Sequence, residues 1–275
     1  MLFRLETETH SKITKGFFCC MKLFLFKTVV LFVSFFVLTG QCLYGSHIGL
    51  LVMATGRYIQ FVEPLIQSAR KHFTPNHQVT YFVFTDSILP NQEDVLYFYQ
   101  PKLGWPFDTM QRYHTYLANK NFLLEQDYLF ACDADMLFVD TVGDEILSER
   151  VATLSPGFSP GSPYPRMRGA YETNPLSTAY VSDAEGDYYF AGGFYGGSRE
   201  EFFKIIEINA THIDQDLQNG IIAEWHDESH WNRYCIDFPP TLILSPSYCY
   251  PENWKIPYTK RLLALDKNHK ELREN

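Results

Sequence analysis

The sequence predicts an α/β protein with a doubly wound, mainly parallel central sheet, helices on both of its faces, and a single domain. Short apolar runs alternate along the chain with segments of helical periodicity, which is the order of β-α-β units in a parallel sheet. The apolar runs are nearly continuous, as in strands that are buried on both faces. The chain has 275 residues. After a short N-terminal segment about 230 remain, which suffices for one large core and would be cramped for two.

The residue pattern predicts the first three elements in order. Residues 47–53 read H-I-G-L-L-V-M, a short apolar run typical of a buried parallel strand. Residues 59–73 have helical spacing, with Leu65 and Ala69 on one apolar face. Residues 79–84 read V-T-Y-F-V-F and predict the second strand. We therefore expect the fold to begin with a β-α-β unit.

A second helix and a third strand follow. Residues 106–119 are predicted to be helical, and residues 128–132 form an apolar run that ends in two carboxylates, Asp133 and Asp135. In open sheets of this class, ligands bind outside the carboxyl ends of the strands. The predicted topology therefore places both aspartates where a ligand is expected.

The spacing of Asp133 and Asp135 is informative in itself. Residues at i and i+2 of an extended segment point the same way, so both carboxylates can face one point. Such oxygens suit Mg²⁺ or Mn²⁺, which complete their shells with water and substrate phosphates. This is the arrangement that an enzyme needs to hold a nucleoside diphosphate. The alternative is a solvated turn that closes a core strand, because Asp is common where strands end.

Two later segments are irregular or rich in glycine. Residues 155–169 are rich in Pro, Gly and Ser, and loops this long inside compact domains are usually functional or mobile. Residues 186–197 read G-D-Y-Y-F-A-G-G-F-Y-G-G. These glycines either allow close approach of the backbone to a ligand or form a tight turn between two aromatic strands. Helical periodicity resumes at residues 200–208.

Composition excludes one class of partner. The formal net charge of −9 argues against a general nucleic-acid surface, which would be basic, so no nucleic-acid partner is expected. A nucleotide bound locally through a metal and a few basic residues stays compatible with this charge. Aromatic residues make up 16% of the chain and serve either sugar stacking or a large core.

The six cysteines are interpreted as structural. No C-x-x-C pair and no zinc-binding spacing occurs in the sequence. A disulfide between Cys235 and Cys249 is compatible with the sequence but nothing in it requires one.

Residues 1–45 are interpreted as an N-terminal signal or anchor segment and residues 46–275 as the folded domain. Lysines flank or interrupt an apolar stretch at 23–38, whose uninterrupted part, 28–38, is 11 residues long. That length suits the core of a signal peptide better than a bilayer span of about 20 residues. The lack of a clean cleavage site favours an uncleaved single-pass type II anchor. In both interpretations the domain lies outside the cytosol. An anchored domain would sit in a Golgi membrane or in a bacterial envelope.

A second acidic cluster lies at residues 224–233, which read E-W-H-D-E-S-H-W-N-R. It crowds two carboxylates, two imidazoles and an indole into six positions. The simpler interpretation is that Asp227 caps the start of a helix and Glu228 is exposed in its first turn. His226 and His230 would then be a pair of satisfied polar side chains.

Four ordered motifs, taken together, closely resemble glycosyltransferase family 6, which includes the histo-blood-group A and B transferases, the α-1,3-galactosyltransferase and the Forssman enzyme. The resemblance extends from about residue 47 to the C-terminus. The motifs are D-A-D-M-x-F-x-D from Asp133, G-D-Y-Y-x-x-G-G-F-x-G-G-S from Gly186, W-H-D-E-S-H-x-N from Trp225 and L-S-P-x-Y from Leu244.

This resemblance implies a GT-A fold and a retaining transfer of GalNAc or Gal from a UDP-sugar. It implies an α-1,3 product linkage and, as the acceptor, a terminal galactose of an oligosaccharide, glycolipid or glycoprotein. It also implies that Asp133 and Asp135 hold the cofactor Mn²⁺ against the UDP diphosphate. Glu228 matches the catalytic glutamate. Covalent double displacement and front-face departure both give retention and stay open.

The resemblance assigns further positions residue by residue. Gly193 leaves room for an N-acetyl group and favours UDP-GalNAc, whereas Ser155 replaces a histidine common at an acceptor position. Trp105 matches a tryptophan on a mobile loop that closes over the donor. The expected donor and UDP contacts are Met53, Thr55, Tyr58, Arg112, Asp133, Ala191, Gly193, Asp227, Lys267 and Arg273, and the expected acceptor contacts are Ser155, Trp225 and Glu228.

Two rival functions are weighed against this one. Another nucleotide-sugar enzyme with a D-x-D motif, such as a family 8 transferase, would not carry the W-H-D-E-S-H motif. A non-catalytic carbohydrate-binding domain on the same fold would be expected to lose Asp133, Asp135 or Glu228, and all three are present.

Overall fold

The computed structural model describes residues 45–159 and 169–273. From Ser46 on, the chain forms one compact unit. The signal or anchor segment expected in residues 1–45 lies almost wholly outside the described residues and stays a prediction. In the described ranges, no helix combines the length and the apolar character needed to cross a membrane.

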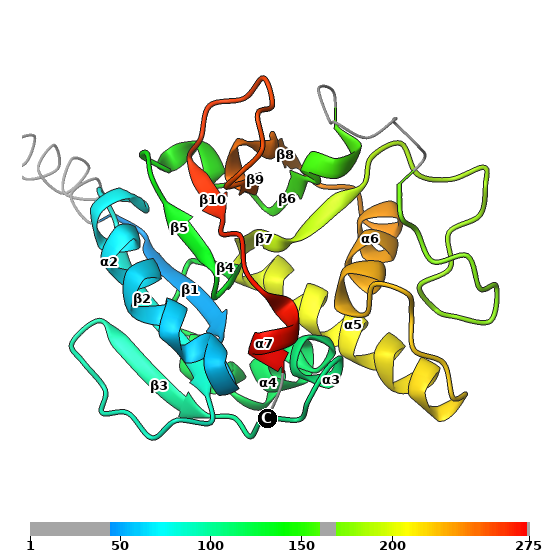
Figure 1. Ribbon diagram of the computed structural model, residues 1–275, viewed down its shortest axis with the longest axis horizontal. Helices are drawn as coiled ribbons and strands as arrows, with labels where there is room; N and C mark the ends of the chain where they lie inside the picture. The colour runs from blue at the N-terminus through cyan, green and yellow to red at the C-terminus, as the bar shows by residue number, and fades with distance from the viewer. Residues whose placement is uncertain (1–44, 160–168, 274–275) are drawn as a thin grey trace, which may run out of the picture. The chain divides into compact units, whose positions relative to one another are not determined.

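A seven-stranded sheet forms the centre of the domain, in the order β3-β2-β1-β4-β7-β6-β8 (Figure 1). The first four neighbours, β3, β2, β1 and β4, run parallel, whereas β7 is antiparallel to both β4 and β6. This confirms the mainly parallel α/β sheet. The strands are β1 (His47–Met53), β2 (Gln78–Thr85), β3 (Val95–Tyr99), β4 (Tyr128–Asp133), β6 (Arg150–Leu154), β7 (Phe190–Ser198) and β8 (Leu242–Leu244).

A smaller sheet joins the middle of the chain to its end. Its strands are β5 (Met136–Phe138), β10 (Leu262–Ala264) and β9 (Tyr250–Pro251), with β10 in the centre. Strand β5 directly follows the two aspartates, and the N–H of Leu265 donates to the carbonyl of Asp135 at 3.0 Å. The C-terminal segment is thereby held beside the end of β4.

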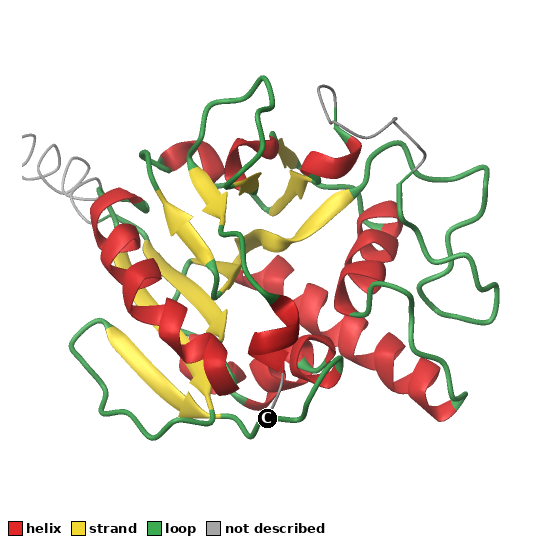
Figure 2. Ribbon diagram, in the orientation of Figure 1, coloured by secondary structure: helices red, strands yellow, loops and turns green. Residues whose placement is uncertain are grey.

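Helices cover both faces of the large sheet (Figure 2). Helix α2 packs on one face, and α4 and α5 pack on the other. The α-helices are α2 (Val62–His72), α3 (Phe107–Met110), α4 (Arg112–Ala118), α5 (Arg199–Gln218), α6 (Asp227–Asp237) and α7 (His269–Arg273). Short 3-10 helices are η2 (Gly56–Phe61), η3 (Lys120–Leu123), η4 (Asp144–Ile146), η5 (Pro156–Phe158) and η6 (Pro246–Tyr248).

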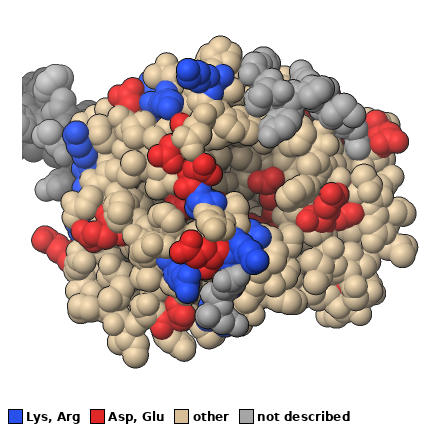
Figure 3. All heavy atoms as spheres, in the orientation of Figure 1, with Lys and Arg blue, Asp and Glu red and all other residues tan. Residues whose placement is uncertain are grey.

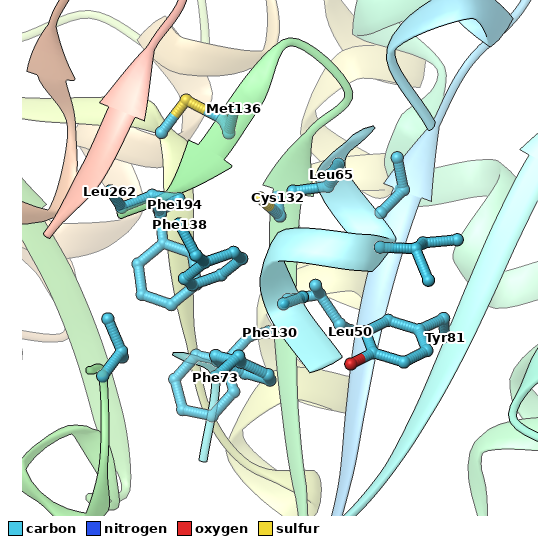
Figure 4. Packing of buried hydrophobic residues seen from close by; sticks show 14 of the residues in the cluster. Leu50, Leu65, Phe73, Tyr81, Phe130, Cys132, Met136, Phe138, Phe194 and Leu262 are labelled. Atoms are coloured by element: carbon cyan, nitrogen blue, oxygen red, sulfur yellow. The ribbon is translucent and has the colours of Figure 1, made fainter. Parts of the chain in front are cut away.

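Strand β1 shows how the period of two divides the core. Ile48, Leu50 and Val52 are fully buried in the cluster under α2, shown in Figure 4. Leu51 points the other way and is fully buried among residues of α4 and α5. Burial on both faces explains the continuous apolar run, because each alternate side chain meets its own helical layer.

Two predicted helices differ from the structure in detail, and one pairing that the sequence left open does not form. The helix expected at 59–73 begins with the 3-10 turn η2, and the helix expected at 106–119 is divided at Gln111, whose ψ of 8° breaks the regular repeat. A disulfide between Cys235 and Cys249 is not formed, since both thiols are free and buried.

The tight turn considered for residues 186–197 is wrong over most of that range, because residues 190–198 form the single strand β7. Its small residues are required by the neighbouring strands. A Cβ atom on Gly196 would collide with the backbone of Leu129 in β4. Close strand pairing therefore accounts for this glycine.

Candidate active site

One cavity opens at the carboxyl ends of β1 and β4. Met53 ends the first of these strands and Asp133 ends the second, so the cavity lies at the edge where a parallel sheet binds ligands. Its opposite wall is the start of α6, and the C-terminal segment closes a third side. Figure 3 shows acidic and basic side chains close together around a hollow in this face of the molecule.

The cavity collects most of the residues that the sequence singled out. Three stand apart from its lining, namely Ser155, Ala191 and Gly193. Ala191 and Gly193 lie in β7, and Ser155 follows β6 and donates its backbone N–H to the carbonyl of Tyr189 at 2.9 Å. The predicted residues that do line the cavity are Met53, Thr55, Tyr58, Trp105, Arg112, Asp133, Asp135, Trp225, Asp227, Glu228, Lys267 and Arg273.

Sequence reasoning missed several lining residues. Lys102, Asp108 and Thr109 come from the segment around Trp105, and His226 and His269 adjoin residues that were singled out. The signal available in the sequence was that these residues lie close in the chain to residues already singled out. It carries little weight in sequence alone, because a neighbour in the chain can equally point away from a site.

Arg112 is the structural centre of the site. It is 4% exposed and forms ion pairs with two carboxylates: Nη2 lies 2.9 Å from Asp133 Oδ1, and Nε lies 2.9 Å from Asp227 Oδ2. Burial by itself would lower the pKa of Arg112, but the charges of Asp227 and Asp133 outweigh it and hold this pKa well above its usual value. The permanent cation thus joins the end of β4 to the start of α6.

The second aspartate of the D-x-D motif has a different partner. Asp135 is 3% exposed, and its carboxylate forms an ion pair with the ammonium group of Lys267 from the C-terminal segment. Burial lowers the pKa of Lys267, whereas the nearby Asp133 raises it. Within the described ranges, no three His, Cys, Asp or Glu side chains are placed to hold a metal ion by themselves.

The C-terminal helix closes over the cavity and contacts the predicted mobile loop. The guanidinium carbon of Arg273 lies 3.4 Å from the ring centroid of Trp105. That indole in turn contacts the ring of His226, with 4.7 Å between centroids. Arg57 of η2 donates to the carbonyl of Glu271 at 3.1 Å, which ties α7 to the first turn after β1. The C-terminal segment and the residues around Trp105 therefore form one wall of the cavity.

The start of α6 differs from the simpler interpretation of the sequence. The helix begins at Asp227, its N-cap position is His226, and the His226 side chain makes no capping hydrogen bond to the described residues. Asp227 is 7% exposed and pairs with Arg112, so it is not the capping residue considered above. Glu228 lines the cavity, so its exposure in a solvated first turn is also wrong. Burial raises the pKa of Asp227 to about 6, against the opposing effect of Arg112.

Both oxygens of the Glu228 carboxylate accept hydrogen bonds. The Tyr189 hydroxyl donates to Oε1 at 2.8 Å, and the N–H of Gly192 donates to Oε2 at 2.7 Å. Burial raises the pKa of Glu228 to about 7, although these two donors lower it; the charges of Asp227 and Asp133 add to the increase. A carboxylate with a pKa near neutrality in a cavity is a recognised mark of a catalytic group.

His230 lies one helical turn after the acidic pair and is fully enclosed. It is 1% exposed, with Nε2 3.8 Å from Asp216 Oδ2 of α5. Burial lowers its pKa to about 4, so it is neutral at pH 7. The expectation that His226 and His230 are both satisfied polar side chains fails for His230, whose Nδ1 is buried and has no hydrogen-bond partner among the described residues.

The fold and the placement of these carboxylates define a glycosyltransferase with the GT-A fold: a mainly parallel sheet presents D-x-D at its carboxyl edge, opposite an acidic pair on a helix. The sequence profile described as "Glycosyltransferase family 6" matches residues 41–274. The chain therefore belongs to glycosyltransferase family 6, which confirms the resemblance of its motifs.

Characterised relatives agree with this assignment. The chain is 37% identical over 245 residues to histo-blood group ABO system transferase 1 of Rattus norvegicus, covering 84% of this chain and 70% of that protein. It is 32% identical over 240 residues to globoside alpha-1,3-N-acetylgalactosaminyltransferase 1 of Gallus gallus, covering 82% and 69%. The human protein of that name is 34% identical over 234 residues, covering 80% and 67%. These relatives support glycosyl transfer as the general activity.

The ionisation of Glu228 should oppose folding. The pKa of Glu228 is about 7 in the folded protein and 4.5 ordinarily. The contribution of protonated Glu228 to the free energy of unfolding is therefore complete below pH 4.5 and is lost as the pH rises through about 7. We expect the free energy of unfolding to fall less between pH 5 and pH 8 in Glu228→Gln than in the wild type, measured by urea denaturation.

Glu200→Gln is the matched control, because Glu200 occupies the first turn of α5 but its side chain is 64% exposed. This variant should keep the pH dependence of the wild type. Parallel pH dependences of Glu228→Gln and the wild type would contradict burial of an ionisable Glu228.

Proposed function

We propose that this protein is a retaining glycosyltransferase that moves GalNAc, or Gal, from its UDP-sugar in α-1,3 linkage to a terminal galactose-type acceptor. The observation that carries the proposal is one cavity in which Glu228 faces the D-x-D aspartates across the buried Arg112. Membership of glycosyltransferase family 6 supports the reaction class.

We propose that the UDP-sugar binds with its uridine at the carboxyl end of β1 and its diphosphate beside Lys267 and Arg273 of the C-terminal segment. Met53, Thr55 and Tyr58 line the cavity where β1 ends, and Lys267 and Arg273 line it from the C-terminal segment. Amino and guanidinium groups suit phosphate oxygens. Departure of the sugar leaves negative charge on the UDP phosphate, and these two cations are placed to stabilise it.

Asp133 and Asp135 are proposed to hold Mn²⁺. The donor set fits the ion: both carboxylates line the same cavity and are hard oxygen ligands, and a cation, the Lys267 ammonium, already pairs with the buried Asp135. Two protein ligands are enough for such a site, because substrate phosphates and water complete the shell. When bound, the ion would supply Lewis-acid stabilisation of the leaving diphosphate.

Glu228 is proposed as the carboxylate that acts on the sugar. Positive charge develops at the anomeric carbon as the bond to UDP breaks, and an anionic Glu228 stabilises it or attacks it. Both routes give retention. Asp227 is proposed to contact the donor sugar, and its ion pair with Arg112 supports its position beside Glu228. The pKa of about 7 for Glu228 places its ionisation near neutral pH.

UDP-GalNAc is proposed as the preferred donor. Gly193 has no side chain, and a Cβ atom there would lie 3.5 Å from Asp133 Oδ2 and 3.4 Å from Cys249 Sγ, so glycine leaves space beside the metal-binding carboxylate. Ala191 is a small residue two positions earlier on the same strand. The chicken and human relatives are named as N-acetylgalactosaminyltransferases, which supports the same choice.

The acceptor is proposed to bind against Trp225 and Ser155, next to Glu228. Trp225 is 49% exposed at the cavity, and its backbone N–H donates to the Ser229 hydroxyl at 3.0 Å, which orders the turn before α6. An exposed indole is a suitable surface for a galactose ring.

The N-terminal segment is proposed to deliver the domain out of the cytosol as a single-pass anchor or an exported signal, with residues 46–275 as the catalytic domain. We expect the full chain, expressed in a eukaryotic cell, to sediment with membranes and to be protected from added protease in sealed vesicles. A protein that is recovered in the cytosolic fraction would contradict this proposal.

Transfer assays with both donors provide the principal test. We expect release of UDP and labelling of galactose-terminated glycans on an array, faster with UDP-GalNAc than with UDP-Gal. Glu228→Gln should lower kcat by roughly 10²-fold or more, because it removes the principal charged group.

Hydrolysis of the donor without acceptor separates an enzyme from a carbohydrate-binding domain. If the folded wild type hydrolyses neither UDP-sugar and transfers neither sugar, the proposed activity is wrong and the non-catalytic alternative is favoured.

Metal removal tests the cofactor. We expect EDTA to abolish transfer and added Mn²⁺ to restore it, because the diphosphate charge would otherwise face Asp133 and Asp135 without a divalent cation. Asp135→Asn should weaken the apparent affinity for Mn²⁺, measured by titration of activity. Full transfer in EDTA would rule out the metal dependence.

A further inference from the structure

We infer that Tyr189 is a positioning residue that holds Glu228 in its reactive orientation by donating its hydroxyl to Oε1. This inference rests on the proposed function, since it concerns the carboxylate to which the proposal gives the central role. Tyr189 immediately precedes β7 and is the fourth and last residue of G-D-Y-Y, a position to which sequence reasoning assigned no role.

The geometry gives each carboxylate oxygen its own donor from one short segment. The Tyr189 hydroxyl lies 2.8 Å from Glu228 Oε1, and the Gly192 N–H lies 2.7 Å from Oε2. A carboxylate held at both oxygens cannot rotate freely about its last torsion. Of the two donors only Tyr189 acts through a side chain, so it is the one that substitution can remove.

The tyrosine is itself firmly placed. It is 4% exposed, and its ring packs between the rings of Phe158 and Tyr171, with centroid distances of 4.9 and 5.3 Å. Its carbonyl accepts the N–H of Ser155 at 2.9 Å. Burial, and next the charge of Glu228, raise the pKa of Tyr189, so the hydroxyl keeps its proton and is the donor.

The helix that carries Glu228 is fixed to the same strand. The Asn232 side-chain oxygen accepts the N–H of Phe190 at 2.8 Å, and its amide nitrogen donates to the carbonyl of Phe190 at 2.9 Å and to that of Glu228, also at 2.9 Å. Asn232 therefore sets the distance between α6 and β7. Because Tyr189 directly precedes Phe190, this fixed distance keeps its hydroxyl within reach of the Glu228 carboxylate.

The charged groups around Glu228 show why a neutral donor matters. Asp227 on the same helix and Asp133 at the end of β4 oppose its ionisation. Arg112 of α4 is engaged by those two aspartates, and Cys249 after η6 is a thiol whose pKa is raised by burial. The hydroxyl of Tyr189 and the N–H of Gly192 are the groups that favour the anion.

A double-mutant cycle tests the inference. Tyr189→Phe keeps the ring and removes the donor, and we expect kcat for sugar transfer to fall about 10-fold while KM for the UDP-sugar changes less than about 2-fold. In the Glu228→Gln background the same change should alter kcat less than about 2-fold, because the group through which Tyr189 acts is gone. The acid limb of the kcat profile should also move up by about one pH unit in Tyr189→Phe.

Tyr171→Phe is the control, since it removes a buried hydroxyl from the same aromatic cluster that donates to the carbonyl of Tyr188 and not to Glu228. It should keep the wild-type kcat and pH profile. A purely structural role for Tyr189 predicts equal kcat losses in the wild-type and Glu228→Gln backgrounds, with no shift of the acid limb, and that result would overturn the inference. Wild-type kcat in Tyr189→Phe would do the same.

One readout does not need turnover. The 13Cδ NMR signal of Glu228, assigned by its loss in Glu228→Gln, should titrate at higher pH in Tyr189→Phe than in the wild type. If the wild type shows no transfer or hydrolysis, the proposed function fails, while an unchanged titration of Glu228 in Tyr189→Phe refutes the hydrogen bond itself.

Discussion

The buried ion pairs of Arg112 are the interaction on which the site depends. One guanidinium, in a helix that begins just after the Trp105 segment, binds the aspartate at the end of β4 and the aspartate at the start of α6. Removing one partner of a buried charge network leaves an uncompensated charge and is strongly destabilising. The network therefore fixes the distance between the D-x-D edge and Glu228, which follows Asp227 directly.

That same arrangement leaves the cavity rich in carboxylates. Asp133, Asp135, Asp227 and Glu228 all line it, and burial raises the pKa of Glu228 to about 7 and that of Asp227 to about 6. In such a site, desolvation and repulsion between like charges disfavour the ionised carboxylates. This agrees with a role in binding a divalent cation and a cationic transition state. Neutral donors, among them Tyr189 and the N–H of Gly192, then keep the carboxylate ionisable near neutral pH.

The second sheet explains how the end of the chain reaches this cavity. Strand β10 pairs with β5, which directly follows the D-x-D motif, and the N–H of Leu265 donates to the Asp135 carbonyl. Lys267 comes two residues later and meets the Asp135 carboxylate, and α7 follows with Arg273 against the Trp105 ring. The C-terminal segment with Lys267 and Arg273 is thus positioned by backbone pairing, and its side chains close a third side of the cavity.

The sequence by itself determined the α/β class, the strands β1, β2 and β4 and the D-x-D edge, because these depend on local periodicity and on the rule that ligands bind at the carboxyl ends of parallel strands. It did not indicate β3 (Val95–Tyr99). Its ordered motifs also determined the family. Tertiary structure alone decided which polar residues meet. The partners Arg112 and Asp227, Tyr189 and Glu228, and Lys267 and Asp135 are separated by 115, 39 and 132 positions, respectively, in the sequence. Contacts between such distant positions leave no periodic signal in the chain. The same limit explains why the structure rejected Asp227 as a cap and most of residues 186–197 as a turn, since both depend on which neighbour each residue packs against.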